Sequence, residues 1–132
     1  MTRREIREEI FKFLFENELI KNDIDIRLNE IIIENNIKKE EQQKFLKSYV
    51  KNIIQNEDTV VSEIKKQLDG WTYERLGTVE KVLLKISFYE IIIENVGYEI
   101  AINEVVELSK KYGDNKTKEF INGILAKLVK TS

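Results

Sequence analysis

The chain has 132 residues and a formal net charge of -2, with 42% hydrophobic and 35% charged residues, a composition typical of one globular domain with a buried core. It contains no cysteine and no histidine, so disulfides, thiol nucleophiles and the commonest metal ligand and general base are excluded. No apolar run reaches the ~18 residues of a membrane span, and residues 1–12 are charged where a signal peptide would be apolar. We therefore expect a cytoplasmic protein without a membrane partner.

Apolar residues recur at every third or fourth position along the chain, and no proline interrupts them. This spacing predicts an all-α fold of about seven helices. The first helix is expected over residues 2–20 and the second over residues 24–35, with Asp23 as the N-cap between them. Leu46 and Val50 belong to the apolar stripe of a third helix.

The helix expected over residues 78–95 differs from the others because it has almost no polar face. A helix that is apolar nearly all round is surrounded by other helices, so we place it at the centre of the fold, with Gly97 ending it. The remaining helices are expected between Asn56 and Gly70, over residues 101–112 and, with Thr117 as N-cap, up to Val129.

Positive charge is concentrated near the C-terminus. Residues 109–132 carry six lysines against two acidic residues, a net +4 that leaves -6 for residues 1–108. Such an uneven distribution suits either a phosphate-facing patch or a solvated surface. No glycine-rich phosphate loop, nucleophile elbow or metal-ligand spacing accompanies it, so we expect no enzyme activity, no metal and no cofactor.

The first helix carries a second face besides its core stripe. At about 100° per residue, Arg4, Arg7, Phe11 and Phe15 fall within about 80° of one another. Guanidinium groups bind phosphate and an exposed ring stacks on a base, so this face suits single-stranded RNA. In the alternative interpretation, both phenylalanines pack against a neighbouring helix and the arginines pair with nearby glutamates.

Two stretches in the second half hold polar residues inside apolar helical runs. One begins Trp-Thr-Tyr-Glu-Arg-Leu at residues 71–76, and the other joins Ala-Ile-Asn-Glu at 101–104 to Phe-Ile-Asn-Gly-Ile-Leu at 120–125. Near the N-terminus, three arginines precede Leu14 and Phe15. In order and spacing these segments resemble the NusB family of bacterial transcription antitermination factors, over nearly the whole chain and most weakly between residues 19 and 68.

The resemblance implies one all-helical, RNA-binding domain over residues 1–132, with two small helical subdomains at roughly 1–70 and 71–132 around a buried central helix. It also implies binding to the boxA element of ribosomal RNA leader transcripts together with a small-subunit ribosomal protein in the NusE role. That pair would join an RNA polymerase complex and suppress premature termination. The family catalyses no reaction and uses no cofactor.

The family's functional residues can be carried over to matching positions. The resemblance implies that the arginine-rich segment contacts phosphates and that the aromatic residue of the first helix stacks on a base. It also implies that the fifth helix supplies an acceptor for a base edge and that the start of the last helix lies beside the same RNA. Asn103 and Glu104, in the first turn of their helix, and Gly123, closely packed, are expected to be structural. The predicted RNA-binding residues are Arg3, Arg4, Arg7, Phe15, Glu80, Lys116, Thr117, Lys118 and Phe120.

The chain also departs from the family. Phe15 stands where a tyrosine is usual and Lys85 where an arginine is usual, and Glu8 follows the basic run closely. We therefore expect weak affinity for RNA alone and a strong dependence on the ribosomal partner. Two alternatives remain: a helical protein-protein adaptor that does not touch RNA, and a detached NusB-like domain of a ribosomal RNA methyltransferase. Burial of both phenylalanines would favour the adaptor or a plain core.

Overall fold

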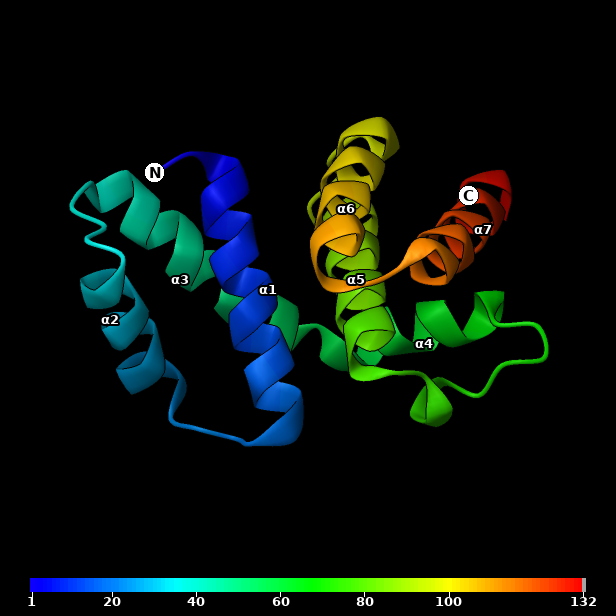
Figure 1. Ribbon diagram of the computed structural model, residues 1–132, viewed down its shortest axis with the longest axis horizontal. Coiled ribbons are helices and arrows are strands. Elements are labelled where there is room, and N and C mark those ends of the chain that lie inside the picture. The colour runs from blue at the N-terminus through cyan, green and yellow to red at the C-terminus, as the bar shows by residue number, and fades with distance from the viewer. Residues whose placement is uncertain (132) are drawn as a thin grey trace. The chain divides into compact units, whose positions relative to one another are not determined.

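The computed structural model describes residues 1–131, which form helices and connecting loops without a strand among them, so the all-α prediction is confirmed. Within this range, no helix combines the length and the apolar surface that a membrane span requires. The elements, shown in Figure 1, are α1 (Arg3–Leu19), α2 (Ile24–Glu34), α3 (Glu40–Gln55), α4 (Glu57–Gln67), the short 3-10 turn η1 (Tyr73–Arg75), α5 (Thr78–Phe88), the π-helical turn η2 (Tyr89–Ile93), α6 (Tyr98–Tyr112) and α7 (Asn115–Thr131).

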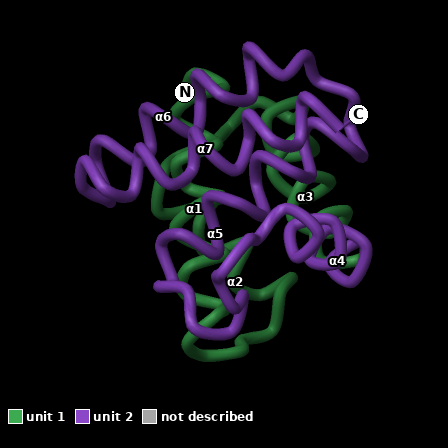
Figure 2. Tube along the Cα trace, turned by 90° about the vertical axis from the view of Figure 1, so that its right-hand side faces the viewer, with its two compact units in different colours: residues 1–55 green, residues 56–132 purple. Residues whose placement is uncertain are grey.

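The chain divides into two compact units, residues 1–55 and residues 56–132 (Figure 2). The sequence placed the division near residue 70 instead. The difference lies in α4, which packs against α5 and α7 and therefore belongs to the second unit. Asn56 alone connects α3 to α4, and the polar residues 56–58 mark this boundary in the sequence. Nothing in them indicates which helices α4 will pack against.

In the first unit, α1 and α2 both pack against α3, with Ile6, Ile10 and Leu46 fully buried. A capping box fixes where α1 begins, because the Glu5 backbone N–H donates to the Thr2 hydroxyl at 3.1 Å and the Thr2 N–H donates to the Glu5 carboxylate at 2.7 Å. These hydrogen bonds lower the pKa of the Glu5 carboxyl. Glu5 is thus engaged in helix capping.

In the second unit, α5 is the central helix. All its residues from Val82 to Phe88 are buried, and α4, α6 and α7 pack around it, which confirms the prediction. The charged Lys85 is accommodated in this helix because its Nζ lies 3.0 Å from Glu57 Oε1 on α4. The helix then continues into the π-helical turn and ends at Ile93. Gly97 therefore does not end the central helix, as the sequence predicted, but lies directly before α6.

Two further helix boundaries differ from those expected. Because α6 begins at Tyr98, Asn103 and Glu104 lie in its second turn and their prediction as first-turn residues is wrong. Thr117 is not the N-cap of α7, which begins at Asn115. Asp114 caps it, since its carboxylate accepts the Thr117 N–H at 2.8 Å and its carbonyl accepts the first helical hydrogen bond.

Candidate nucleic-acid interface

The arginines of the first unit are arranged around an aromatic ring of α3. Arg3 and Arg4 are exposed and Arg7 is half-buried. The Arg3 guanidinium carbon lies 3.9 Å from the centroid of the Phe45 ring, and that of Arg7 lies 5.8 Å from it. Attraction between a cation and a ring face uses no hydrogen-bond donor, so the contact with Phe45 does not occupy the N–H groups with which Arg3 could bind phosphate.

The two phenylalanines of α1 have different environments. Phe11 is 2% exposed and belongs to the core, whereas Phe15 is half-buried. Their ring centroids are 6.2 Å apart, so the buried ring supports the outer one. The outcome that would have favoured a plain core, burial of both rings, is not found, and Phe15 alone retains surface for stacking.

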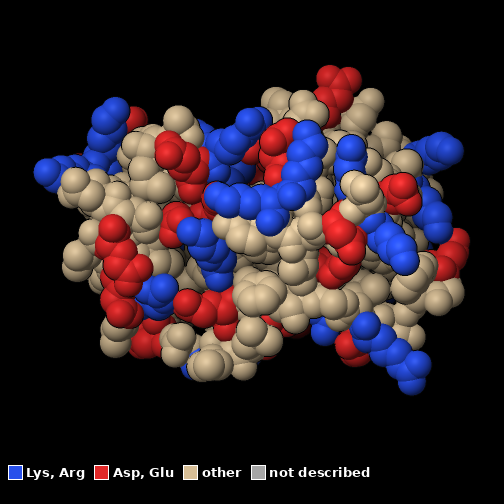
Figure 3. Space-filling view, viewed as in Figure 1, with Lys and Arg blue, Asp and Glu red and all other residues tan. Residues whose placement is uncertain are grey.

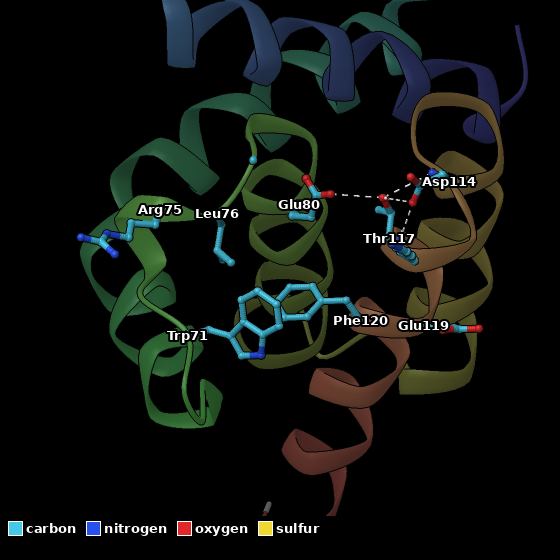
Figure 4. A pocket seen from close by; sticks show the side chains of 10 residues that line it. Trp71, Arg75, Leu76, Glu80, Asp114, Thr117, Glu119 and Phe120 are labelled. Carbon is cyan, nitrogen blue, oxygen red and sulfur yellow. Dashed lines mark hydrogen bonds between the residues drawn. The ribbon is translucent and has the colours of Figure 1, made fainter.

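The second unit contains a pocket of about 600 Å³ between the loop that follows α4 and the first turns of α7 (Figure 4), which we call the Trp71 pocket. Its apolar end is built by the rings of Trp71 and Phe120, which meet edge to face with centroids 5.0 Å apart. Its polar end holds two carboxylates and a hydroxyl. The lining residues that matter here are Trp71, Leu76, Glu80, Asp114, Thr117 and Phe120.

Thr117 organises the polar end of the Trp71 pocket. Its side chain is largely covered, with 6% of the residue exposed. The hydroxyl oxygen lies 3.1 Å from Glu80 Oε1 and 3.0 Å from Asp114 Oδ1, and its single proton can be donated to one of these carboxylates at a time. Hydrogen bonds from the Thr117 N–H and hydroxyl hold the pKa of the Asp114 carboxyl below its ordinary value. Thr117 therefore positions Glu80 on α5 against the start of α7.

Two glycines make room for this hydrogen-bonded group. A Cβ atom on Gly77 would lie 2.6 Å from Glu80 Oε2, and one on Gly113 would lie 2.7 Å from Thr117 Cγ2. Both distances are far below van der Waals contact. The structure thus shows that Gly77 and Gly113 each leave space for a side chain of the pocket.

Of the two basic residues at the start of α7, Lys116 and Lys118, one lines the pocket. Lys116 is exposed and lines the rim, while Lys118 is half-buried and lies outside the lining. Arg75 also lines the pocket, and its guanidinium group points away from Thr117 and Phe120 (Figure 4). On the face of each unit seen in Figure 3, basic and acidic side chains are interspersed, in keeping with a net charge of -2.

Gly123 does not pack closely against another backbone. A Cβ atom there would meet nothing within 4 Å, and both Gly123 and Asn122 are exposed. The prediction of close packing is wrong because α7 turns Ile121, Ile124 and Leu125 toward the core and these two residues toward the opposite face.

The chain is similar to known proteins over nearly its whole length. Residues 4–130 match the family model described as the NusB family. The chain belongs to the NusB family. It is 42% identical over 135 residues to the transcription antitermination protein NusB of Fusobacterium nucleatum subsp. nucleatum, covering 95% of this chain and 86% of that protein. The protein of the same name from Oceanobacillus iheyensis is 31% identical over 130 residues, with 98% and 99% covered.

A solved structure agrees with this assignment. It is the crystal structure of the antitermination factors NusB and NusE in complex with dsRNA, of which one chain matches with a TM-score of 0.87 and 27% sequence identity over 98% of this chain and 97% of that chain. The resemblance to the NusB family drawn from the sequence is thus confirmed, together with its all-helical fold.

In this member of the NusB family, the predicted RNA-binding residues fall into two sets, one in each unit. Arg3, Arg4, Arg7 and Phe15 lie on α1, whereas Glu80, Lys116, Thr117 and Phe120 line the Trp71 pocket. The sequence did not indicate Phe45 or Trp71 as part of either set. For Phe45, the sequence did offer one indication: it forms an aromatic pair with Tyr49 at the i, i+4 spacing of a helix. In the structure the two ring centroids are 5.9 Å apart.

Proposed function

We propose that the protein is a transcription antitermination factor that binds boxA-type single-stranded RNA of ribosomal RNA leader transcripts. It does so with a small-subunit ribosomal protein in the NusE role, in a complex with RNA polymerase, and suppresses premature termination. The observation that carries this proposal is the membership of the NusB family. It is supported by relatives named transcription antitermination protein and by a matching structure in which NusB and NusE are bound to dsRNA.

Binding would use both sets of residues in one RNA-binding domain of residues 1–132. Arg3, Arg4 and Arg7 contact phosphates, since guanidinium groups bind phosphate oxygens through paired N–H donors. The half-buried ring of Phe15 stacks on a base. The second set consists of Glu80 as the acceptor for a base edge, Thr117 as its positioning residue, and Lys116, Lys118 and Phe120 along the same RNA.

Such a factor acts where RNA polymerase transcribes, which places it in the cytoplasm, and it works by binding without catalysing a reaction. Affinity for RNA alone is expected to be low, because the net charge is -2 and the arginines share α1 with several glutamates. The ribosomal partner would then supply a large part of the RNA affinity.

The test is a titration of fluorescently labelled boxA-like RNA and a scrambled sequence with the full chain, alone and with the ribosomal protein. We expect boxA-like RNA to bind about tenfold more tightly when the ribosomal protein is present, a coupling of ordinary size, and the scrambled RNA to gain much less. Equal binding of both RNAs in every condition would remove the proposal. Equal boxA affinity with and without the partner would contradict the partner dependence alone.

A further inference from the structure

We propose that Phe45 on α3 is a positioning residue for RNA binding, because its ring holds the guanidinium group of Arg3 in place before a phosphate arrives. This inference rests on the proposed RNA-binding function and adds to it a residue that acts on RNA only through Arg3. The contact that carries it joins the Arg3 guanidinium carbon to the centroid of the Phe45 ring over 3.9 Å. That distance is well inside the roughly 6 Å within which a cation and a ring face attract each other.

The first argument concerns the side chain of Arg3, which is exposed at the start of α1. A long exposed side chain samples many rotamers in water, and ordering it when a ligand binds lowers the affinity. Within residues 1–131 no carboxylate pairs with this guanidinium, which lies over the Phe45 ring instead. The contact therefore orients the positive charge of Arg3 without neutralising it.

The second argument is that an arginine at this position does not stabilise the helix. The start of a helix carries partial positive charge from its unpaired N–H groups, so a cation in the first turn is repelled. Glu5, which closes the capping box with Thr2, is the kind of residue that this place favours. Positive charge gathered at a helix start suits a bound phosphate, so the position of Arg3 is explained by binding and not by stability.

The third argument is that α3 also holds the backbone next to Arg3. The carbonyl oxygen of Met1 accepts a hydrogen bond from the side-chain amide of Gln42. Gln42 precedes Phe45 by three residues on α3, so the two side chains lie on the same face of that helix. This face therefore holds both the backbone before Arg3 and the arginine side chain itself.

The ring of Phe45 is itself fixed in position. It is half-buried on α3, the helix that packs against α1 (Figure 1). Tyr49, 5% exposed, supports it from one turn further along, with the ring planes at 70° and the centroids 5.9 Å apart. Arg7 approaches the same ring at 5.8 Å. Phe45 thus presents a fixed ring to two cations that, four residues apart on one helix, repel each other.

The contact between Arg3 and Phe45 can be measured in the free protein by nuclear magnetic resonance. Protons above an aromatic ring are shifted upfield by its ring current, so the side-chain signals of Arg3 in the full chain should be shifted upfield. Phe45→Leu should return these signals to their ordinary positions, whereas Phe45→Tyr should keep them shifted. Ordinary positions in the parent protein would overturn the inference without bearing on RNA binding.

The affinity for RNA then shows whether the ring acts through Arg3. The probe is labelled boxA-like RNA, titrated with the full chain in the presence of the ribosomal protein. Phe45→Leu should weaken binding about fourfold, within the range that ordering one long side chain contributes, and Phe45→Tyr should bind like the parent. In an Arg3→Ala background, Phe45→Leu should weaken binding no further, because two residues that act as one unit are not additive.

The salt dependence separates positioning from direct phosphate contact. Arg3→Ala removes one charge and should lower the slope of log affinity against log salt by about 0.7. Phe45→Leu removes no charge, so it should lower the affinity at every salt concentration and leave the slope unchanged. The matched control is Phe13→Leu, the same change at a ring of α1 that is 3% exposed. It should leave the RNA affinity unchanged under conditions where circular dichroism shows every variant folded.

The outcomes distinguish this inference from the proposed function. Parent-like affinity of the Phe45→Leu protein, or an equal loss in Phe13→Leu, would overturn the positioning role and leave RNA binding intact. A loss that persists in the Arg3→Ala background would mean that Phe45 touches the RNA itself, which also overturns the inference. Failure of the boxA-like RNA to bind, with and without the ribosomal protein, would overturn both proposals.

Discussion

Replacing Arg4 and Arg7 together by alanine should weaken RNA binding about tenfold at low salt and flatten its salt dependence. Each phosphate contact with a single strand contributes about 0.7 to the slope of log affinity against log salt, so loss of two contacts should reduce the slope by about 1.4. The structural reason is the position of both residues in the first turns of α1, with Arg7 close to the Phe45 ring. Titrations of labelled RNA at several salt concentrations measure both quantities.

A matched control removes the same positive charge elsewhere. Lys66→Ala with Lys130→Ala changes the net charge equally, at two exposed positions of the second unit outside the Trp71 pocket. This control should leave the salt slope within experimental error of the parent protein. If both double variants change the slope alike, the effect is one of overall charge and the assignment of Arg4 and Arg7 as phosphate contacts is defeated.

Phe88→Ala should lower the free energy of unfolding of the second unit by about 3–5 kcal/mol, as expected for a large ring removed from a packed core. Phe88 is 0% exposed and lies near the end of α5, the helix around which α4, α6 and α7 pack. Denaturant unfolding followed by Trp71 emission reports on this unit, because the single tryptophan lies within it.

Two substitutions calibrate that result. Phe88→Leu keeps most of the volume and should cost less than about 1.5 kcal/mol. Ile100→Ala removes an apolar side chain that is 55% exposed on α6 and should change stability by about 0.5 kcal/mol or less. A Phe88→Ala protein no less stable than the Ile100→Ala protein would contradict the central position of α5.

The helices could be predicted from the sequence because each has a local pattern. A nearly continuous apolar stretch placed α5 at the centre, and its burial follows from the same property. Capping chemistry similarly located Asp23, whose carboxylate accepts the Ile26 N–H at 2.9 Å. The start of α7 was misplaced because Asp114 and Thr117 are both good caps, and only the hydrogen bonds between them decide which one serves.

The candidate RNA-binding residues show the same limit of sequence reasoning. The arginines of α1 were predicted because basic and aromatic residues share one helical face, and Glu80 and Phe120 were predicted because of the family resemblance. Phe45 and Trp71 were not among the predicted residues, because each is drawn into a candidate site by a contact with a residue distant in the chain: Arg3 for Phe45 and Phe120 for Trp71. Phe11 illustrates the reverse, because its place on the arginine face did not prevent its burial.

Transcription read-through in a purified system tests the central claim most directly. A template with a boxA-like leader before a terminator would be transcribed by RNA polymerase with the ribosomal protein, with and without this protein. The account predicts that the protein raises the fraction of transcripts extending past the terminator, and that a scrambled leader or the Arg4→Ala and Arg7→Ala variant abolishes the increase. An unchanged fraction on the boxA template, or an equal increase on the scrambled one, would contradict it.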